Sequence, residues 1–142
     1  MAKVKTRLVD AASFDTASLL ISLQKTILPG DAPLDPLTGH WWIVYDHESP
    51  VAFAALRDVP SFRGACYMAR CGVLPKYRGM GLQRRLLTTR ERKARSLGYS
   101  NVITTTLRNP ASANNLIKRG YMTYEPQTRW GAVDTIYWIK SL

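Results

Sequence analysis

The sequence is poor in acidic residues, contains two cysteines and has no long hydrophobic run. Its 142 residues include 20 Lys and Arg but 10 Asp and Glu, which gives a net charge of +10. The longest apolar segments, such as VAFAAL at 51–56, are far shorter than the ~20 residues of a membrane-spanning helix. The opening MAKVKTRLVD also lacks an apolar stretch of signal-peptide length. We therefore expect a cytoplasmic protein that makes no use of a membrane.

The cysteine content argues against a disulfide or metal framework. Cys66 and Cys71 are five residues apart on one predicted strand, where side chains alternate between faces, so the two thiols point in opposite directions and cannot pair. We interpret them as buried free thiols and expect no metal site.

The remaining composition is that of a single folded domain, since 46% of the residues are hydrophobic and can form a core. Hydrophobic periodicity, turn residues and Asn109 as a helix cap predict an α/β fold. The expected helices cover 13–28, 81–97 and 110–119, and the expected strands cover 5–9, 40–45, 51–56, 65–74, 101–107, 121–125 and 134–140.

One cluster of ionisable residues falls in a predicted hairpin turn. Asp46, His47 and Glu48 are consecutive between two apolar strands. Because polar residues of this kind favour tight turns, we interpret the cluster as turn chemistry and not as a catalytic site.

The segment VLPKYRGMGLQRRLL at 73–87 takes the chain from a strand through a glycine-bearing turn into a basic helix. A helix that starts after such a turn presents unpaired backbone N–H groups and the positive end of its dipole, which together bind phosphate. Glycine also allows a ligand to approach the backbone closely. An R-G-x-G turn taken alone is a weak signal for phosphate binding, because many strand-to-helix turns use two glycines for geometry only.

The sequence on both sides of this turn favours phosphate binding over a purely geometric role. The motif V-x-P-x-Y-R-G-x-G-L, followed after a strand by N-x-x-S-x-x-x-L-x-x-x-G-Y, resembles the GNAT superfamily of acyl-CoA-dependent N-acetyltransferases. The resemblance implies one GNAT-like acyltransferase domain over 1–142, with a mixed central sheet of about seven strands flanked by helices. It further implies that the fourth and fifth strands splay around the pantetheine arm of acetyl-CoA, the co-substrate, without a metal.

The resemblance also implies a set of coenzyme-binding residues. Backbone groups of Val73 and Leu74 would bind the pantetheine, and Asn109 and Ser112 would reach the coenzyme from the other side. Gln83 stands where the family usually has a small residue, so its side chain must point away from the pyrophosphate. The pyrophosphate loop itself would consist of Arg78, Gly79, Met80, Gly81, Leu82, Gln83 and Arg84.

The catalytic residues are less clearly marked. Leu116 occupies the position where many members of the family have a tyrosine acid, but a thiolate with a pKa near ~8.5 leaves without much protonation. The strand at 65–74 carries no carboxylate to act as base, so Tyr67 and Tyr124 are the candidates for proton transfer, with packing as the alternative role for each. A backbone N–H near Val73 would hold the oxyanion.

The acceptor is an amine of a small molecule or a protein by the resemblance. The segments 29–39 and 126–133 would border its pocket, and they or their flanks supply Asp31, Asp35, Glu125, Asp134, Arg129 and Trp130. Carboxylates there would suit a cationic amine, whereas Trp130 and Arg129 would suit a nucleic-acid base.

The positive charge leaves a second class of partner open. Arg90, Arg92, Lys93 and Arg95 lie further along the basic helix than a coenzyme phosphate reaches, so they are surplus to coenzyme binding. They would serve a nucleic acid, either in an enzyme similar to the Mom-like DNA-base modification enzymes or in a basic binding module without catalysis.

Overall fold

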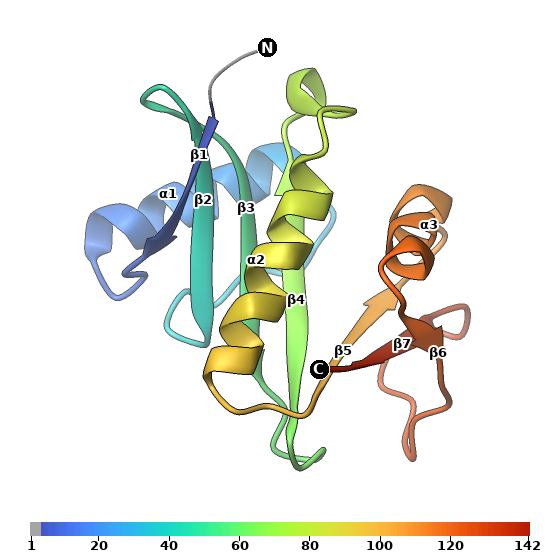
Figure 1. Ribbon diagram of the computed structural model, residues 1–142. Coiled ribbons are helices and arrows are strands. Elements are labelled where there is room, and N and C mark those ends of the chain that lie inside the picture. Colours follow the sequence, from blue (N-terminus) through green and yellow to red (C-terminus); the bar gives the residue numbers. More distant parts are fainter. Residues whose placement is uncertain (1–3) are drawn as a thin grey trace. The chain divides into compact units, whose positions relative to one another are not determined.

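The computed structural model describes residues 4–142 as a mixed α/β structure (Figure 1). Its elements are β1 (Val4–Val9), α1 (Phe14–Ile27), β2 (His40–Asp46), β3 (Ser49–Asp58), β4 (Ala65–Val73), the 3-10 helix η1 (Pro75–Tyr77), α2 (Leu82–Ser96), β5 (Asn101–Thr106), α3 (Pro110–Lys118), β6 (Met122–Thr123) and β7 (Ile136–Ser141).

The strands form one seven-stranded sheet in the order β1-β2-β3-β4-β5-β7-β6. β4 and β5 are parallel, whereas the pairs β1–β2, β2–β3, β5–β7 and β6–β7 are antiparallel. Pairing between β4 and β5 covers Ala65–Tyr67 and Asn101–Ile103, although β4 continues to Val73 and β5 to Thr106. The predicted mixed sheet of seven strands with flanking helices is confirmed.

Most boundaries differ from the predicted ones by one or two residues. The strand expected over 121–125 shortens to β6, so Tyr124 follows it, although its N–H still donates to the Tyr137 carbonyl at 2.9 Å. Ser13 occupies the N-cap position of α1 without a capping bond from its side chain. α2 ends at Ser96, one residue before the predicted end of this helix, and Leu97 is 45% exposed.

The chain divides into two compact units: unit 1 comprises Met1–Arg57 with Met68–Arg90, and unit 2 comprises Asp58–Tyr67 with Glu91–Leu142. The single acyltransferase domain over 1–142 stays a prediction. Across residues 4–142 no helix is long and apolar enough to cross a membrane. The same residues contain no group of three or more His, Cys, Asp or Glu side chains arranged to hold a metal ion.

Unit 1 packs α1 against one face of its strands, with α2 on the other face in Figure 1. Gly72 lets α1 approach β4, because a Cβ at this position would lie 2.7 Å from Ile27 Cγ2 and 2.9 Å from Phe53 Cε1. The core on the α1 face contains Leu20, Leu23, Ile27, Trp41, Ile43, Phe53 and Ala55.

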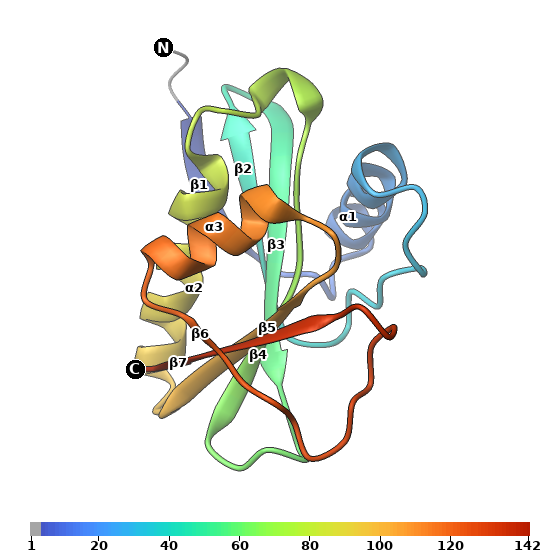
Figure 2. The same cartoon turned by 90° about the vertical axis from the view of Figure 1, so that its right-hand side faces the viewer.

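Unit 2 contains β5 and β7 side by side, with β6 on the outer side of β7 (Figure 2). Its buried residues include Ile103, Leu116, Tyr121 and Tyr137. The two thiols are free, as predicted: Cys66 in this unit is buried, and Cys71 in unit 1 is half-buried. Burial raises the pKa of both, that of Cys66 to about 11, so neither is a reactive thiolate at neutral pH.

Candidate active site

The glycine-bearing turn of unit 1 has the backbone that its sequence predicts. After η1 the chain passes through Gly79 at φ 77° and Gly81 at φ 79°, both in the left-handed region where a side chain is strained. A Cβ at Gly79 would meet no heavy atom within 4 Å, so the backbone there is open to a ligand. These torsion angles explain both glycines by backbone geometry, and their contact with a coenzyme remains a prediction.

The start of α2 is suited to an anion. The helical hydrogen bonds begin with the Arg85 N–H donating to the Gly81 carbonyl at 3.0 Å, and the first turn contains no acidic residue. Arg84 Nη2 lies 3.4 Å from the Cβ position of Gly81, so a guanidinium stands directly beside the turn. Backbone amides, the helix dipole and this cation fit the pyrophosphate of a coenzyme.

The strand end that would bind pantetheine already uses much of its backbone within unit 1. The Leu74 N–H donates to the Val51 carbonyl at 2.9 Å, and the Leu74 carbonyl accepts from the Tyr77 N–H at 2.8 Å. The Val73 carbonyl accepts from Arg78 Nε at 3.3 Å. A pantetheine amide at Leu74 would therefore share or replace these bonds, and the assignment of both residues remains a prediction.

Asn109 and Ser112 lie together at the start of α3 in unit 2. Asn109 Oδ1 accepts from the Ser112 N–H at 3.1 Å, which makes Asn109 the predicted helix cap, and Pro110 takes the first helical position. Gly120, at φ 89°, follows the helix end as expected. This geometry explains both residues by helix capping, and their contact with the coenzyme remains a prediction.

The two candidate catalytic tyrosines belong to unit 2 and have different surroundings. The Tyr67 hydroxyl is 3.0 Å from Thr105 Oγ1, and either oxygen can be the donor. The Tyr124 hydroxyl is buried and has no hydrogen-bond partner among residues 4–142. Burial raises the pKa of Tyr124, and the neighbouring Tyr137 and Tyr67 raise it further, so this phenol is neutral at physiological pH.

Edge-to-face aromatic contacts connect these tyrosines within unit 2. Trp130 lies 6.4 Å from Tyr67 and 4.6 Å from Tyr137, and Tyr137 lies 6.3 Å from Tyr124, between ring centroids. The Tyr137 hydroxyl accepts from the backbone N–H groups of Trp130 and Gly131 at 3.0 and 2.8 Å, so it holds the turn at 126–133 in place. Sequence reasoning missed Tyr137, because an alternating strand tyrosine is indistinguishable from a packing residue.

The carboxylates at the same end of unit 2 are already neutralised. Glu125 pairs with Arg129 at 2.9 Å, and Asp134 pairs with Arg108 at 2.9 Å. Arg129 also donates to the Thr135 carbonyl at 2.8 Å. The other two carboxylates expected near the acceptor, Asp31 and Asp35, belong to unit 1. Trp130 is 53% exposed.

In the middle of the basic helix α2, one arginine is buried and not at the surface as expected. Arg90, expected to belong to the surplus surface charge, is 3% exposed and donates to the Leu86 and Ala55 carbonyls at 3.2 and 3.3 Å. Its assignment to a nucleic-acid surface was wrong, because this position faces the core of unit 1.

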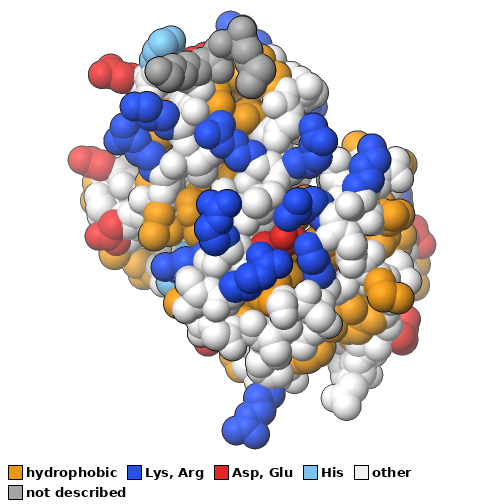
Figure 3. Space-filling model, viewed as in Figure 1, with side chains coloured by type: hydrophobic (Ala, Val, Ile, Leu, Met, Phe, Trp, Pro, Cys, Tyr) orange, Lys and Arg blue, Asp and Glu red, His pale blue; other side chains and the backbone are white. Residues whose placement is uncertain are grey.

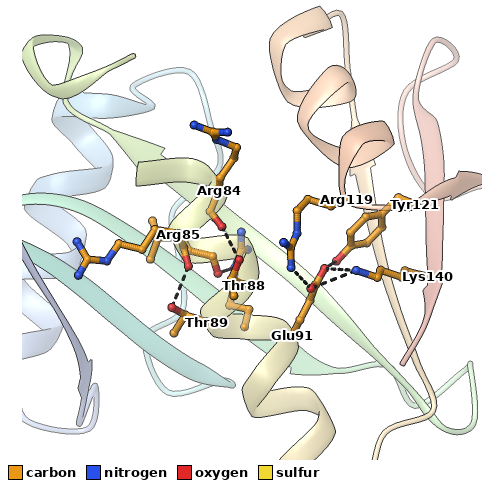
Figure 4. A network of polar contacts seen from close by, with 10 residues as sticks. Arg84, Arg85, Thr88, Thr89, Glu91, Arg119, Tyr121 and Lys140 are labelled. Atoms are coloured by element: carbon orange, nitrogen blue, oxygen red, sulfur yellow. Dashed lines mark hydrogen bonds and ion pairs between the residues drawn. The ribbon is translucent and has the colours of Figure 1, made fainter. Parts of the chain in front are cut away.

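Glu91, the next residue, belongs to unit 2 and is completely buried (Figure 4). Its carboxylate accepts from Arg119 Nη2 at 2.7 Å, from the Tyr121 hydroxyl at 2.8 Å and from Lys140 Nζ at 3.2 and 3.3 Å. Sequence reasoning missed this network. The one signal was that Glu91 is the single acidic residue of a strongly basic helix.

The outer side of α2 retains its positive charge. Figure 3 shows Lys and Arg side chains gathered over this helix. Arg84, Arg85, Arg92 and Arg95 are exposed, and none of them forms an ion pair within residues 4–142.

Comparison with known proteins identifies the family. The model of the acetyltransferase (GNAT) family matches residues 18–121, and the chain belongs to this family of acyltransferase enzymes. No curated protein sequence matches the chain significantly.

Solved structures with the same fold include three acetyltransferases or acetyl-CoA-binding proteins of low identity. An IAA acetyltransferase from Bacillus cereus has a TM-score of 0.78 at 13% identity, covering 99% of this chain and 100% of that one. The ribosomal-protein-S18-alanine N-acetyltransferase from Escherichia coli has a TM-score of 0.75 at 12% identity, with 98% and 94% coverage. The protein yncA from Salmonella typhimurium, solved with its cofactor acetyl-CoA, has a TM-score of 0.73 at 18% identity, with 98% and 94% coverage. They show that the fold is GNAT-like, as predicted.

The Glu91 network generates a stability prediction. Burial by itself would raise the pKa of Glu91, but the hydrogen bonds from Arg119, Tyr121 and Lys140 outweigh it and lower the pKa below its ordinary value. A carboxyl whose pKa is lower in the folded state stabilises the protein fully above its unfolded pKa of ~4.3. This stabilisation is lost as the pH falls through the folded pKa.

We therefore expect Glu91→Gln to lower the free energy of unfolding by about 2–4 kcal/mol at pH 7, because it removes the charge that three donors share. The difference from wild type should shrink below about pH 4. Urea unfolding at pH 7 and pH 3 measures both effects. Glu125→Gln, which removes an exposed paired carboxylate, is the control and should change stability by less than about 1 kcal/mol. Equal effects of the two variants would contradict the prediction.

Proposed function

We propose that this protein transfers an acetyl group from acetyl-CoA to an amine by direct attack. The family assignment supports an acyltransferase, and the turn into α2 supports the coenzyme. Gly79 and Gly81 expose the backbone beside Arg84 at a helix start without acidic residues, which is the arrangement that a pyrophosphate requires.

The reaction needs little from the protein on the leaving-group side. The amine nitrogen forms a bond to the thioester carbonyl carbon and releases a proton to solvent, the tetrahedral intermediate collapses, and the carbon–sulfur bond breaks to release the coenzyme thiolate. Because a thiol pKa is near ~8.5, the thiolate leaves at neutral pH without the acid that Leu116 cannot supply. An alkylammonium acceptor with a pKa of ~10.4 must lose a proton before it can attack. Residues near the amine are therefore needed to accept or pass on that proton.

Tyr67 and Tyr124 are assigned to this acceptor side with different roles. The hydroxyl pair of Tyr67 and Thr105 can pass a proton through either oxygen, which suits a relay from the amine to solvent. Tyr124 has a raised pKa and is therefore a hydrogen-bond donor and not a base at neutral pH.

The charges of unit 2 favour an acceptor with an apolar or aromatic group beside its amine. Glu125 and Asp134 are paired with arginines, whereas the exposed Trp130 offers a flat apolar surface in contact with Tyr67 and Tyr137. A polycationic acceptor such as a polyamine would find no unpaired carboxylate among these residues.

Coenzyme binding is tested at Gly81. Gly81→Asp adds bulk and negative charge beside the expected pyrophosphate, so acetyl-CoA affinity measured by calorimetry should fall at least about 100-fold. Gly98→Asp places the same side chain at a similar positive φ just beyond the other end of α2, and it should leave the affinity unchanged. Unchanged binding in Gly81→Asp would remove the site assignment, and no binding to wild type would remove the function.

The relay is tested with matched hydroxyl deletions. Tyr67→Phe and Thr105→Val should each lower kcat/KM for an amine about tenfold or more, and the double variant should be no slower than the slower single variant, because they interrupt one path. Tyr124→Phe should leave the shape of the pH–rate profile between pH 6 and 9 unchanged, since its phenol stays neutral there. If Tyr67→Phe keeps wild-type turnover at every pH, the relay assignment is wrong.

A second candidate is an acetyltransferase, or a binding module on the same fold, whose partner is a nucleic acid. The observation that favours it is the exposed row of arginines on α2, in which Arg92 and Arg95 are three residues apart and share one face of the helix. Both lie at least ten residues after Leu82, beyond the helix start where a pyrophosphate would bind.

This candidate predicts salt-dependent binding to duplex DNA or RNA. The Arg92→Gln/Arg95→Gln variant should reduce the slope of log affinity against log salt by about 2, without changing acetyl-CoA affinity. Arg108→Gln, whose guanidinium is neutralised by Asp134, is the control with a single change in charge and should keep the slope. Label transfer from acetyl-CoA only to small amines or peptides, with weak DNA binding insensitive to these arginines, would exclude the nucleic-acid candidate.

A further inference from the structure

Tyr77 connects the coenzyme-binding turn to a residue that the sequence places in a hairpin. Its hydroxyl donates to Asp46 Oδ2 at 2.6 Å, and both residues belong to unit 1. Asp46 is the last residue of β2 and is 31 positions away in the chain, so this bond is a tertiary contact and not part of the turn itself.

The contact has the features of a strong hydrogen bond. A short bond from a phenol to a carboxylate is charge-assisted, and the Asp46 side chain is 17% exposed, which limits competition from water. The hydrogen bond to Asp46 is also the main cause that raises the pKa of Tyr77, with smaller contributions from burial and from the charge of Asp46. The other carboxylate oxygen, Oδ1, is buried without a hydrogen-bond partner among residues 4–142 and lies 3.8 Å from His47 Nε2.

Tyr77 occupies the last position of η1, immediately before the pyrophosphate loop. Its backbone N–H donates to the Leu74 carbonyl at 2.8 Å, and the Arg78 N–H donates to the Pro75 carbonyl at 3.2 Å. The segment from Pro75 to Gly81 contains two glycines and five exposed residues, so local bonds alone hold it weakly. Arg78 Nε bonds this segment to the Val73 carbonyl at the end of β4, and the Tyr77 hydroxyl bonds it to the end of β2.

We propose that Asp46 is a positioning residue for the coenzyme, acting through Tyr77. By anchoring η1 to the end of β2, it holds the backbone of 78–81 in the conformation that receives the pyrophosphate, and it lowers the conformational cost of binding. The inference rests on the proposed function and extends it. It assigns Asp46 a role in coenzyme binding, in addition to the turn chemistry expected for Asp46, His47 and Glu48.

The test compares Tyr77→Phe, Asp46→Asn and the double variant. Tyr77→Phe should raise the KM and the Kd for acetyl-CoA about fivefold to tenfold, with kcat and the KM for the amine unchanged. Asp46→Asn keeps an acceptor oxygen but loses the charge, so its effect should be smaller. The double variant should match Tyr77→Phe, since both changes remove one contact.

Tyr99→Phe is the matched control. Its hydroxyl also donates to an aspartate, Asp58, in unit 2, so it loses the same kind of bond away from the coenzyme loop. It should change the melting temperature without changing the Kd for acetyl-CoA. An equal rise of the Kd in Tyr99→Phe would mean that general destabilisation, and not positioning, is responsible.

A second measurement needs no ligand. Amide hydrogen exchange at residues 76–82 should be faster in Tyr77→Phe than in wild type, with exchange in α1 unchanged. Wild-type protein that fails to bind acetyl-CoA would overturn the proposed function. If the wild-type protein binds acetyl-CoA, but Tyr77→Phe has the same Kd and the same amide exchange at residues 76–82, this inference alone is overturned.

Discussion

Gly79 and Gly81 hold the backbone between β4 and α2 in the left-handed region, and the coenzyme site proposed for unit 1 depends on that turn. In this turn the chain passes from the strand into the helix through torsion angles that side chains disfavour and that glycine adopts readily. The same glycines keep the space above the backbone open and bring Arg84 beside it. The geometry of the turn and the proposed binding of a coenzyme therefore both favour glycine at these positions. For this reason the motif can be recognised from the sequence.

The positive charge of α2 serves two purposes that composition alone cannot separate. Arg90 is buried and satisfies backbone carbonyls, whereas Arg92 and Arg95 are exposed to solvent. Between them in the sequence, the buried carboxylate of Glu91 accepts hydrogen bonds from Arg119, Lys140 and the Tyr121 hydroxyl. A buried charge persists only when it is fully hydrogen-bonded, so the basic residues Arg119 and Lys140 are structural partners and do not belong to an anion-binding surface.

The part of unit 2 proposed to face the acceptor is organised by aromatic contacts and by ion pairs. Tyr137 holds the turn at 126–133 by accepting two backbone N–H groups, and arginines neutralise the nearby carboxylates. The sequence left an acidic and an aromatic acceptor surface open as equal alternatives. In the structure, Glu125 and Asp134 form exposed ion pairs with arginines, whereas the exposed Trp130 contacts Tyr67 and Tyr137.

The sequence by itself determined the order of helices and strands, the glycine turn, the Asn109 cap and the family, because each rests on neighbours within a few positions. It could not determine the end of β6, the inward direction of Arg90, the burial of Glu91 or the bond from Tyr77 to Asp46. Those features join residues that are distant along the chain, 28 to 49 positions apart for the partners of Glu91. A carboxylate in a hairpin and one that anchors a loop have the same local sequence, and only tertiary packing, which brings a donor within 2.6 Å of Asp46, distinguishes them.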